Sequence, residues 1–155
     1  MIKLSRISFG GAAAIVTSVA LIVGLDAAHA ARSAIVSALL IAAVADNLTD
    51  SLSVHIYQES ERLEETEAFF GTLTNFVTRF VLCLTFVLLI VILPTSIGVT
   101  AAIIWGTVLL ATLSWVLASQ RGVGALSEVI KHLLVATAII VASKGIGYWI
   151  GEYIA

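Results

Sequence analysis

The stretch LLIAAVADNLTDSLSVHIYQESE, from Leu39 to Glu61, begins as an apolar helix pattern and becomes acidic and polar in mid-course. Asp46 and Asp50 lie in it one helical turn apart. The segments on both sides are as apolar as lipid, and carboxylates at such a depth are rare unless they serve a function. These two residues are therefore the best indication of function in the chain.

The composition defines the class of protein. Of the 155 residues, 60% are hydrophobic and 12% are charged, and the mean hydropathy is +1.10, whereas a soluble domain carries about 25% charged residues. We expect an all-α integral membrane protein with one membrane domain over residues 1–155 and no large soluble domain. The net charge of −2 and the lack of a basic stripe give no indication of a nucleic acid partner. Cys83 has no second cysteine with which to form a disulfide.

Five segments are long enough to cross the membrane, because a helix needs about 20 apolar residues to span the hydrocarbon core. An acidic connection at 58–70 joins the second span to the third, and Pro94 ends the third. Gly147 and Gly151 in the last span have the GxxxG spacing that permits close helix contact. The expected spans are about 7–25, 33–57, 71–93, 97–119 and 126–150.

The distribution of lysine and arginine predicts the orientation, since positively charged loops stay on the cytoplasmic side. A cytoplasmic N-terminus leaves Arg32 as the one basic residue in the outer loops. Arg79 is then expected to extend from the start of the third span to the inner interface. The inner segments would hold Lys3, Arg6, Arg62, Arg79, Arg121 and Lys131.

The N-terminus also has a competing interpretation. Lys3 and Arg6, the apolar run and the sequence Ala28-His29-Ala30 together resemble a secretory signal cleaved before Ala31. Against cleavage, the run from Ile7 to Leu25 is longer than the usual signal core and is rich in Gly and Ala, as packed membrane helices are. We expect it to be kept as the first span.

From Gly10 to Glu61 the chain resembles, without gaps, the first two helices of the vacuolar iron transporter family. The matching features are Ile15-Val16-Thr17, Gly24-Leu25, Ala45-Asp46 and Ser60-Glu61. The count of five spans and the KGIGYWIG segment of the last span are also similar to that family. The resemblance implies a homodimer that exports ferrous iron or manganese from the cytosol in exchange for protons. A bacterial or archaeal plasma membrane is the expected location.

The chain also departs from the pattern of this family. Ala13 stands where members carry an acidic residue early in the first span, and Asp50 stands where they carry a methionine. Ala42 corresponds to a glutamate of some members. The helical metal-binding insertion of larger members is reduced to a few glutamates. Only Asp46 corresponds directly, to an acidic residue of many prokaryotic relatives.

The residues themselves also indicate a cation site. On a regular helix, Asp46, Asp50, Ser53 and Tyr57 share one face with Asn47 beside it, and this makes an oxygen-rich stripe. Ferrous iron, manganese and magnesium accept such ligands, and a two-fold axis near this face would double the carboxylates. The predicted metal-binding residues are Asp46, Asn47, Asp50, Glu61, Glu64 and Glu65.

Lys144 is the charged residue that lies deepest within the last span. By helix rise, Lys144 lies about 18 Å from the inner end of the last span, and Asp46 lies about 18 Å from the outer end of the second span. In a hydrocarbon core about 30 Å thick, the two residues therefore lie at similar depths. Lys144 could form a structural ion pair with Asp46, or it could be a coupling residue whose ammonium occupies the acidic site when metal is absent. The sequence leaves both alternatives open.

The glutamates at positions 59, 61, 64, 65 and 67 have two interpretations as well. Such a cluster usually forms a solvated face. Glu61, Glu64 and Glu65 could instead gather at the mouth of the site and raise the local cation concentration.

No nucleophile with a paired base, phosphate-binding loop or zinc-ligand spacing is found in the sequence, so an enzyme is not expected. Two function classes stay open. The first is an exporter of divalent metal, for which the lipid bilayer, the metal ion and a second copy are the expected partners. The second is a transport-inactive membrane protein that keeps the fold and serves an interaction or structural role.

Overall fold

The computed structural model of the chain describes residues 4–60 and 65–154, with side chains for all of these except 4–9, 58, 59, 65, 67 and 68. This part of the chain is helical and contains no strand. The elements are α1 (Leu4–Ala27), α2 (Arg32–Ile41), the π-helical segment η1 (Ala42–Asp46), α3 (Asn47–Ser60), α4 (Glu65–Ile92), α5 (Thr95–Arg121) and α6 (Ala125–Tyr153).

Five stretches of these helices are long and apolar enough to cross a membrane, which confirms the expected number. The second of them is built from α2, η1 and α3 in direct succession. Much of the expected acidic connection is helical, because α3 continues to Ser60 and α4 begins at Glu65. The five stretches are Gly10–Ala27, Arg32–Tyr57, Phe69–Ile92, Thr95–Arg121 and Ala125–Tyr153.

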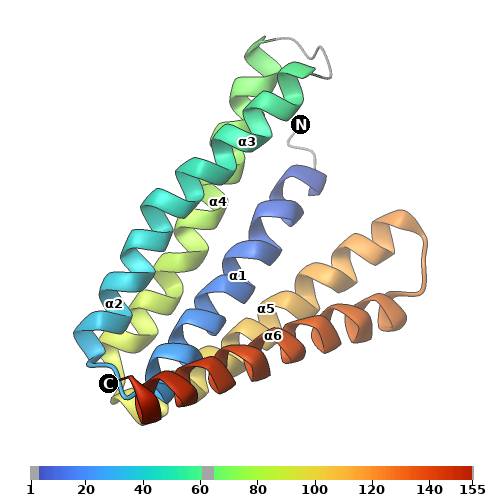
Figure 1. Ribbon diagram of the computed structural model, residues 1–155. Helices are drawn as coiled ribbons and strands as arrows, with labels where there is room; N and C mark the ends of the chain where they lie inside the picture. Colours follow the sequence, from blue (N-terminus) through green and yellow to red (C-terminus); the bar gives the residue numbers. More distant parts are fainter. Residues whose placement is uncertain (1–3, 61–64, 155) are drawn as a thin grey trace.

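Helix α1 lies at the centre of the molecule. It lies between an arm formed by α2, α3 and α4 and a second arm formed by α5 and α6 (Figure 1). The two arms converge near the start of α2 and diverge toward the opposite end (Figure 1). The hydrophobic core follows this arrangement, with Ile15, Val19 and Ile22 of α1 buried against side chains such as Phe86 of α4 and Ala102 of α5.

Arg32 ties the start of α2 to the end of α4. Its Nε donates to the carbonyl of Ile90 at 2.7 Å, and one terminal nitrogen donates to that of Leu93 at 3.0 Å and also to that of Val91. The last carbonyls of a helix have no partner within the helix, and a cation is favoured there. Arg32 therefore serves as the C-terminal cap of α4, just before Pro94.

Glycines bring α6 against α1. A Cβ placed on Gly147 would lie 1.9 Å from the carbonyl oxygen of Gly24, and one on Gly151 would lie 3.3 Å from the Cα of Ala28. The GxxxG spacing of α6 is thus a packing feature, and its partner is α1 of the same chain.

Candidate functional site

The π-helical segment determines which side chains of the second span face α4. Five residues spaced by four, Ile35, Leu39, Ala43, Asn47 and Ser51, are all buried. In a regular α-helix each such step drifts by about 40°. The wider turn of η1, in which the Asn47 N–H bonds to the carbonyl five residues back at Ala42, takes up this drift. Asn47 and Ser51 therefore stay in line with the apolar residues that precede them.

Arg79 of α4 binds three side chains of the second span. Its Nε donates to Asn47 Oδ1 at 2.7 Å, and one terminal nitrogen donates to Asp46 Oδ2 at 3.0 Å. The other terminal nitrogen donates to Asp50 Oδ2. Asn47 Nδ2 donates to the carbonyl of Ala43 at 2.7 Å, which orients the amide so that its oxygen faces the guanidinium. We name Asp46, Asn47, Asp50 and Arg79 the carboxylate–guanidinium cluster.

The charges of this cluster do not balance. Two carboxylates and one guanidinium leave a formal charge of −1. The Arg79 side chain is 2% exposed, whereas those of Asp46 and Asp50 are 49% and 37% exposed. The cation is therefore enclosed, and both carboxylates have an open side on the surface of the described chain. A further cation could approach from that side without displacing the core.

The expectation that Arg79 extends to the inner interface is wrong, because its guanidinium is buried in the cluster. One signal in the sequence could have shown this. Arg79 lies ten residues beyond Phe69, where the apolar stretch begins, and ten residues of helix rise about 15 Å. That is half of the hydrocarbon core, which is too deep for a side chain to reach the interface easily.

Arg79 takes the place beside Asp46 that one of the two alternatives, the structural ion pair, gave to Lys144. Lys144 is exposed on α6 and makes no ion pair with any residue that the structure describes. An arginine suits the position better than a lysine, because its planar fork presents five donors that can reach several acceptors at once.

Three of the predicted metal-binding residues, Asp46, Asn47 and Asp50, meet at Arg79. Glu61 and Glu64 lie outside the described residues, and Glu65 begins α4 with its side chain not described. Within residues 4–60 and 65–154, no group of three His, Cys, Asp or Glu side chains is placed to hold a metal ion. Ser53 and Tyr57 are exposed, and neither is among the side chains that bind Arg79.

The buried polar line continues beyond the cluster in both directions along α4. One turn after Arg79, Cys83 accepts a hydrogen bond from Ser18 of α1 at 3.5 Å. One turn before Arg79, Asn75 lies against Gly10, whose missing Cβ would fall 2.0 Å from Asn75 Oδ1. The neighbouring face of α1 carries small residues, and these leave the space in which the larger polar side chains of α4 lie.

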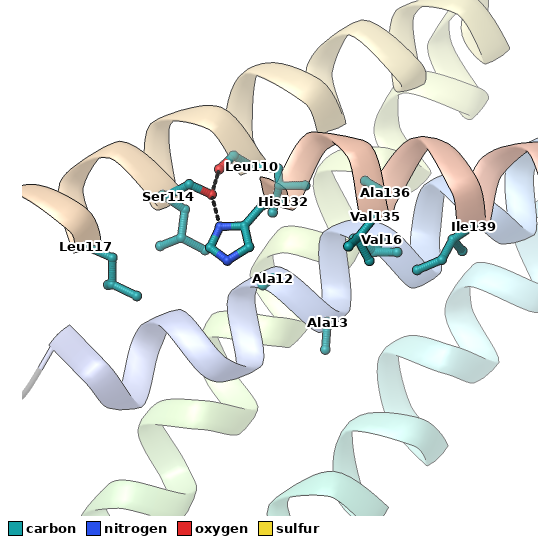
Figure 2. A pocket seen from close by; sticks show the side chains of 11 residues that line it. Ala12, Ala13, Val16, Leu110, Ser114, Leu117, His132, Val135, Ala136 and Ile139 are labelled. Atoms are coloured by element: carbon teal, nitrogen blue, oxygen red, sulfur yellow. Dashed lines mark hydrogen bonds between the residues drawn. The ribbon is translucent and has the colours of Figure 1, made fainter. Parts of the chain in front are cut away.

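A second polar feature lies between α1, α5 and α6. There His132 lines a cavity of about 340 Å³ whose other lining residues are mostly apolar, among them Ala12 and Ala13 (Figure 2). Ser114 Oγ donates its hydrogen to the carbonyl of Leu110 at 2.7 Å, so it must accept from His132 Nδ1 at 2.8 Å. This bond requires a hydrogen on Nδ1 of the His132 ring. Its other nitrogen lies on the side facing α1 (Figure 2).

Comparison of the chain with protein-family models, with curated proteins and with solved structures gives no match.

Proposed function

We propose that this protein is a membrane transporter that moves a divalent metal, ferrous iron or manganese, out of the cytosol. The observation that supports the proposal is the uncompensated carboxylate in the carboxylate–guanidinium cluster. Asp46 lies about 21 Å along the helix from Arg32 and about 17 Å from Tyr57, near the middle of the second candidate span. A charge at that depth is costly unless a partner or function retains it.

A purely structural ion pair would not require two carboxylates on one arginine. One carboxylate is enough to neutralise Arg79, yet two are held on it, and each keeps an exposed side. Carboxylate and amide oxygens are the ligands that manganese accepts, and imidazole and carboxylate ligands also suit iron. The geometry supports a site that binds cations reversibly.

The proposed homodimer would explain the preference for a divalent ion. Each cluster carries −1, so two clusters brought together by a two-fold axis carry −2, which one divalent cation neutralises. Protons could take the place of the metal when it leaves. The exchange of metal for protons is part of the proposal.

A second candidate function is favoured by a different observation. Arg79 already occupies both carboxylates, and the described residues offer no set of three metal-binding side chains. In a transport-inactive membrane protein the cluster would join the second span to α4 and nothing more.

Metal flux into vesicles separates the two candidates. Purified protein reconstituted in liposomes should transport Mn²⁺ or Fe²⁺, and Asp50→Asn or Asp46→Asn should lower the rate at least about tenfold, since even outer partners of a metal site change its affinity by that much. The asparagine keeps a hydrogen-bond acceptor for Arg79, so the fold should survive. Asp26→Asn is the matched control, because Asp26 is an exposed acid at the end of α1, and its rate should equal that of the wild type.

The outcome against the proposal is equally definite. Folded wild-type protein that transports neither ion, and gives no tolerance to metal-sensitive cells, would exclude the exporter and leave the structural role.

A further inference from the structure

Asn75 and Ser51 are buried polar residues that lack hydrogen-bond partners. Asn75 is 2% exposed and Ser51 is 4% exposed. Neither polar atom of the Asn75 amide nor the Ser51 hydroxyl has a partner among the residues that the structure describes. Burying a polar group without a partner is unfavourable, and most buried polar groups in proteins are paired. The two side chains therefore call for an explanation.

Both residues lie beside the carboxylate–guanidinium cluster: Ser51 directly follows Asp50, and Asn75 lies one turn before Arg79. The second span and α4 are antiparallel, and Asn47 contacts Arg79. Ser51 is one turn after Asn47, and Asn75 is one turn before Arg79. Because the helices are antiparallel, helix geometry puts Ser51 and Asn75 on facing surfaces one turn from the contact between Asn47 and Arg79.

The Arg79 side chain is already directed toward this level. Side chains on a helix lean toward its N-terminus, which for Arg79 is the turn that carries Asn75. A Cβ on Gly10 would meet Asn75 Oδ1 at 2.0 Å and Arg79 Cγ at 3.0 Å. The Asn75 amide and the aliphatic part of Arg79 thus share the space that Gly10 leaves free.

We propose that Asn75 and Ser51 form a second binding position for the Arg79 guanidinium, occupied when a cation neutralises Asp46 and Asp50. The Asn75 amide oxygen and the Ser51 hydroxyl oxygen are acceptors, and the guanidinium has donors for both. The guanidinium leaves the carboxylates, shifts toward the turn of α4 that carries Asn75 and stays within reach of hydrogen-bond acceptors. The identity of the cation rests on the proposed function, whereas the second position itself does not.

This arrangement explains how a cation could compete with a buried arginine. If the guanidinium had nowhere to go, displacing it would leave a buried unpaired charge, and that is strongly unfavourable. The unpartnered acceptors lower the cost of displacement. They make Arg79 a positioning residue with two states, and Asn75 and Ser51 the residues that define the second state.

A metal-free mutant cycle tests the second position. In wild-type protein, Asn75→Leu removes an unpartnered amide, so the melting temperature should stay the same or rise. In Asp46→Asn/Asp50→Asn protein the guanidinium should bind Asn75, and there Asn75→Leu should lower the melting temperature by about 4 °C or more. Asn47→Leu is the contrast in the wild-type background, because it breaks a bond that exists and should destabilise the protein.

The proposal is wrong if Asn75→Leu changes the melting temperature equally in both backgrounds. If the doubly substituted protein does not fold, Asp46→Ser/Asp50→Ser, which also removes both charges, provides the second background, with the same two outcomes.

A titration with Mn²⁺ tests the role of the second position in binding. In a stable Asn75→Leu protein the affinity should fall at least about tenfold, because the guanidinium now stays on the carboxylates. An unchanged affinity beside a wild type that binds Mn²⁺ would overturn the proposal. A wild type that binds no Mn²⁺ counts against the proposed function, and the metal-free cycle then decides the inference alone.

Discussion

At the scale of single residues, the charges around Arg79 cannot be altered independently. All three of its partners come from the second span, and each accepts a hydrogen bond from a different nitrogen of the guanidinium. Removing the cation leaves two carboxylates facing each other without compensation. Removing one carboxylate leaves a neutral pair, which is the milder change.

Arg79→Met should therefore lower the free energy of unfolding by about 3 kcal/mol, which is the lower end of the range for breaking a buried ion pair because both carboxylates are partly exposed. Lys144→Met is the matched control. Lys144 is exposed and makes no ion pair with a described residue, so its loss should change stability by about 0.5 kcal/mol or less. Chemical unfolding in detergent measures both.

Equal destabilisation by the two variants would contradict the assignment of Arg79 as the partner of Asp46. A stable Lys144→Met protein whose transport responds differently to pH would retain Lys144 as a coupling residue.

The sequence predicted the carboxylates of this site but not its cation. Asp46 and Asp50 are recognisable because an acid in an apolar stretch is rare. The prediction placed the Arg79 guanidinium at the inner interface because the hydropathy pattern describes a residue's own span only. It does not show which side chains of the neighbouring helix lie beside that residue. Asn75 has no signal of its own in the sequence, since its neighbour Gly10 comes from another helix.

At the scale of helices, the contact between α1 and α6 depends on glycine at one face only. Gly147 is in contact with the backbone of Gly24, whereas a Cβ on Gly145 would meet nothing within 4 Å. The two glycines lie two residues apart on α6, so they point in different directions.

Gly147→Ala should separate α1 from α6 and destabilise the protein, because a Cβ 1.9 Å from a carbonyl oxygen forces the backbone to move. Gly145→Ala should stabilise it by about 0.5–1 kcal/mol, the usual difference between the two residues inside a helix. Melting temperatures of the two variants should therefore fall on opposite sides of the wild-type value. A shift of the same sign in both would show that α6 does not pack on α1 in this register.

Helix positions were more predictable than helix contacts. The number of spans follows from apolar length alone, and the structure reproduces it. The π-helical turn at Ala42–Asp46 could not be predicted. It depends on whether the Asn47 N–H bonds to the carbonyl five residues back, at Ala42, or to the one four residues back. That choice reflects packing against α4, which has no counterpart in the local sequence.

At the scale of the whole molecule, α1 is the helix on which the two arms assemble. It contributes Ala14, Ile15, Ser18, Val19, Ile22 and Val23 to the buried residues. A chain without it would expose the inner faces of both arms. Retention of the first span therefore stays our prediction.

We expect five spans with a cytoplasmic N-terminus and the C-terminus outside, on the basis of the lysine and arginine distribution. A reporter fused after Ala155 should be active in its extracytoplasmic form, and intact-mass measurement should show α1 in the mature protein. A mature chain that begins at Ala31 would contradict the five-span topology, and a cytoplasmic reporter would contradict the orientation.

The π-helical segment has a genetic consequence. Its wider turn holds one residue more than a regular helix needs, so deleting a single codon between Ala42 and Asp46 would leave a regular helix and keep the residues after it facing α4. A regular helix that kept all of the present residues would instead rotate Asn47 and Asp50 by about 100° away from Arg79. In genetic terms the segment is an in-frame insertion that the helix tolerates, so relatives with and without the extra codon could carry the same site.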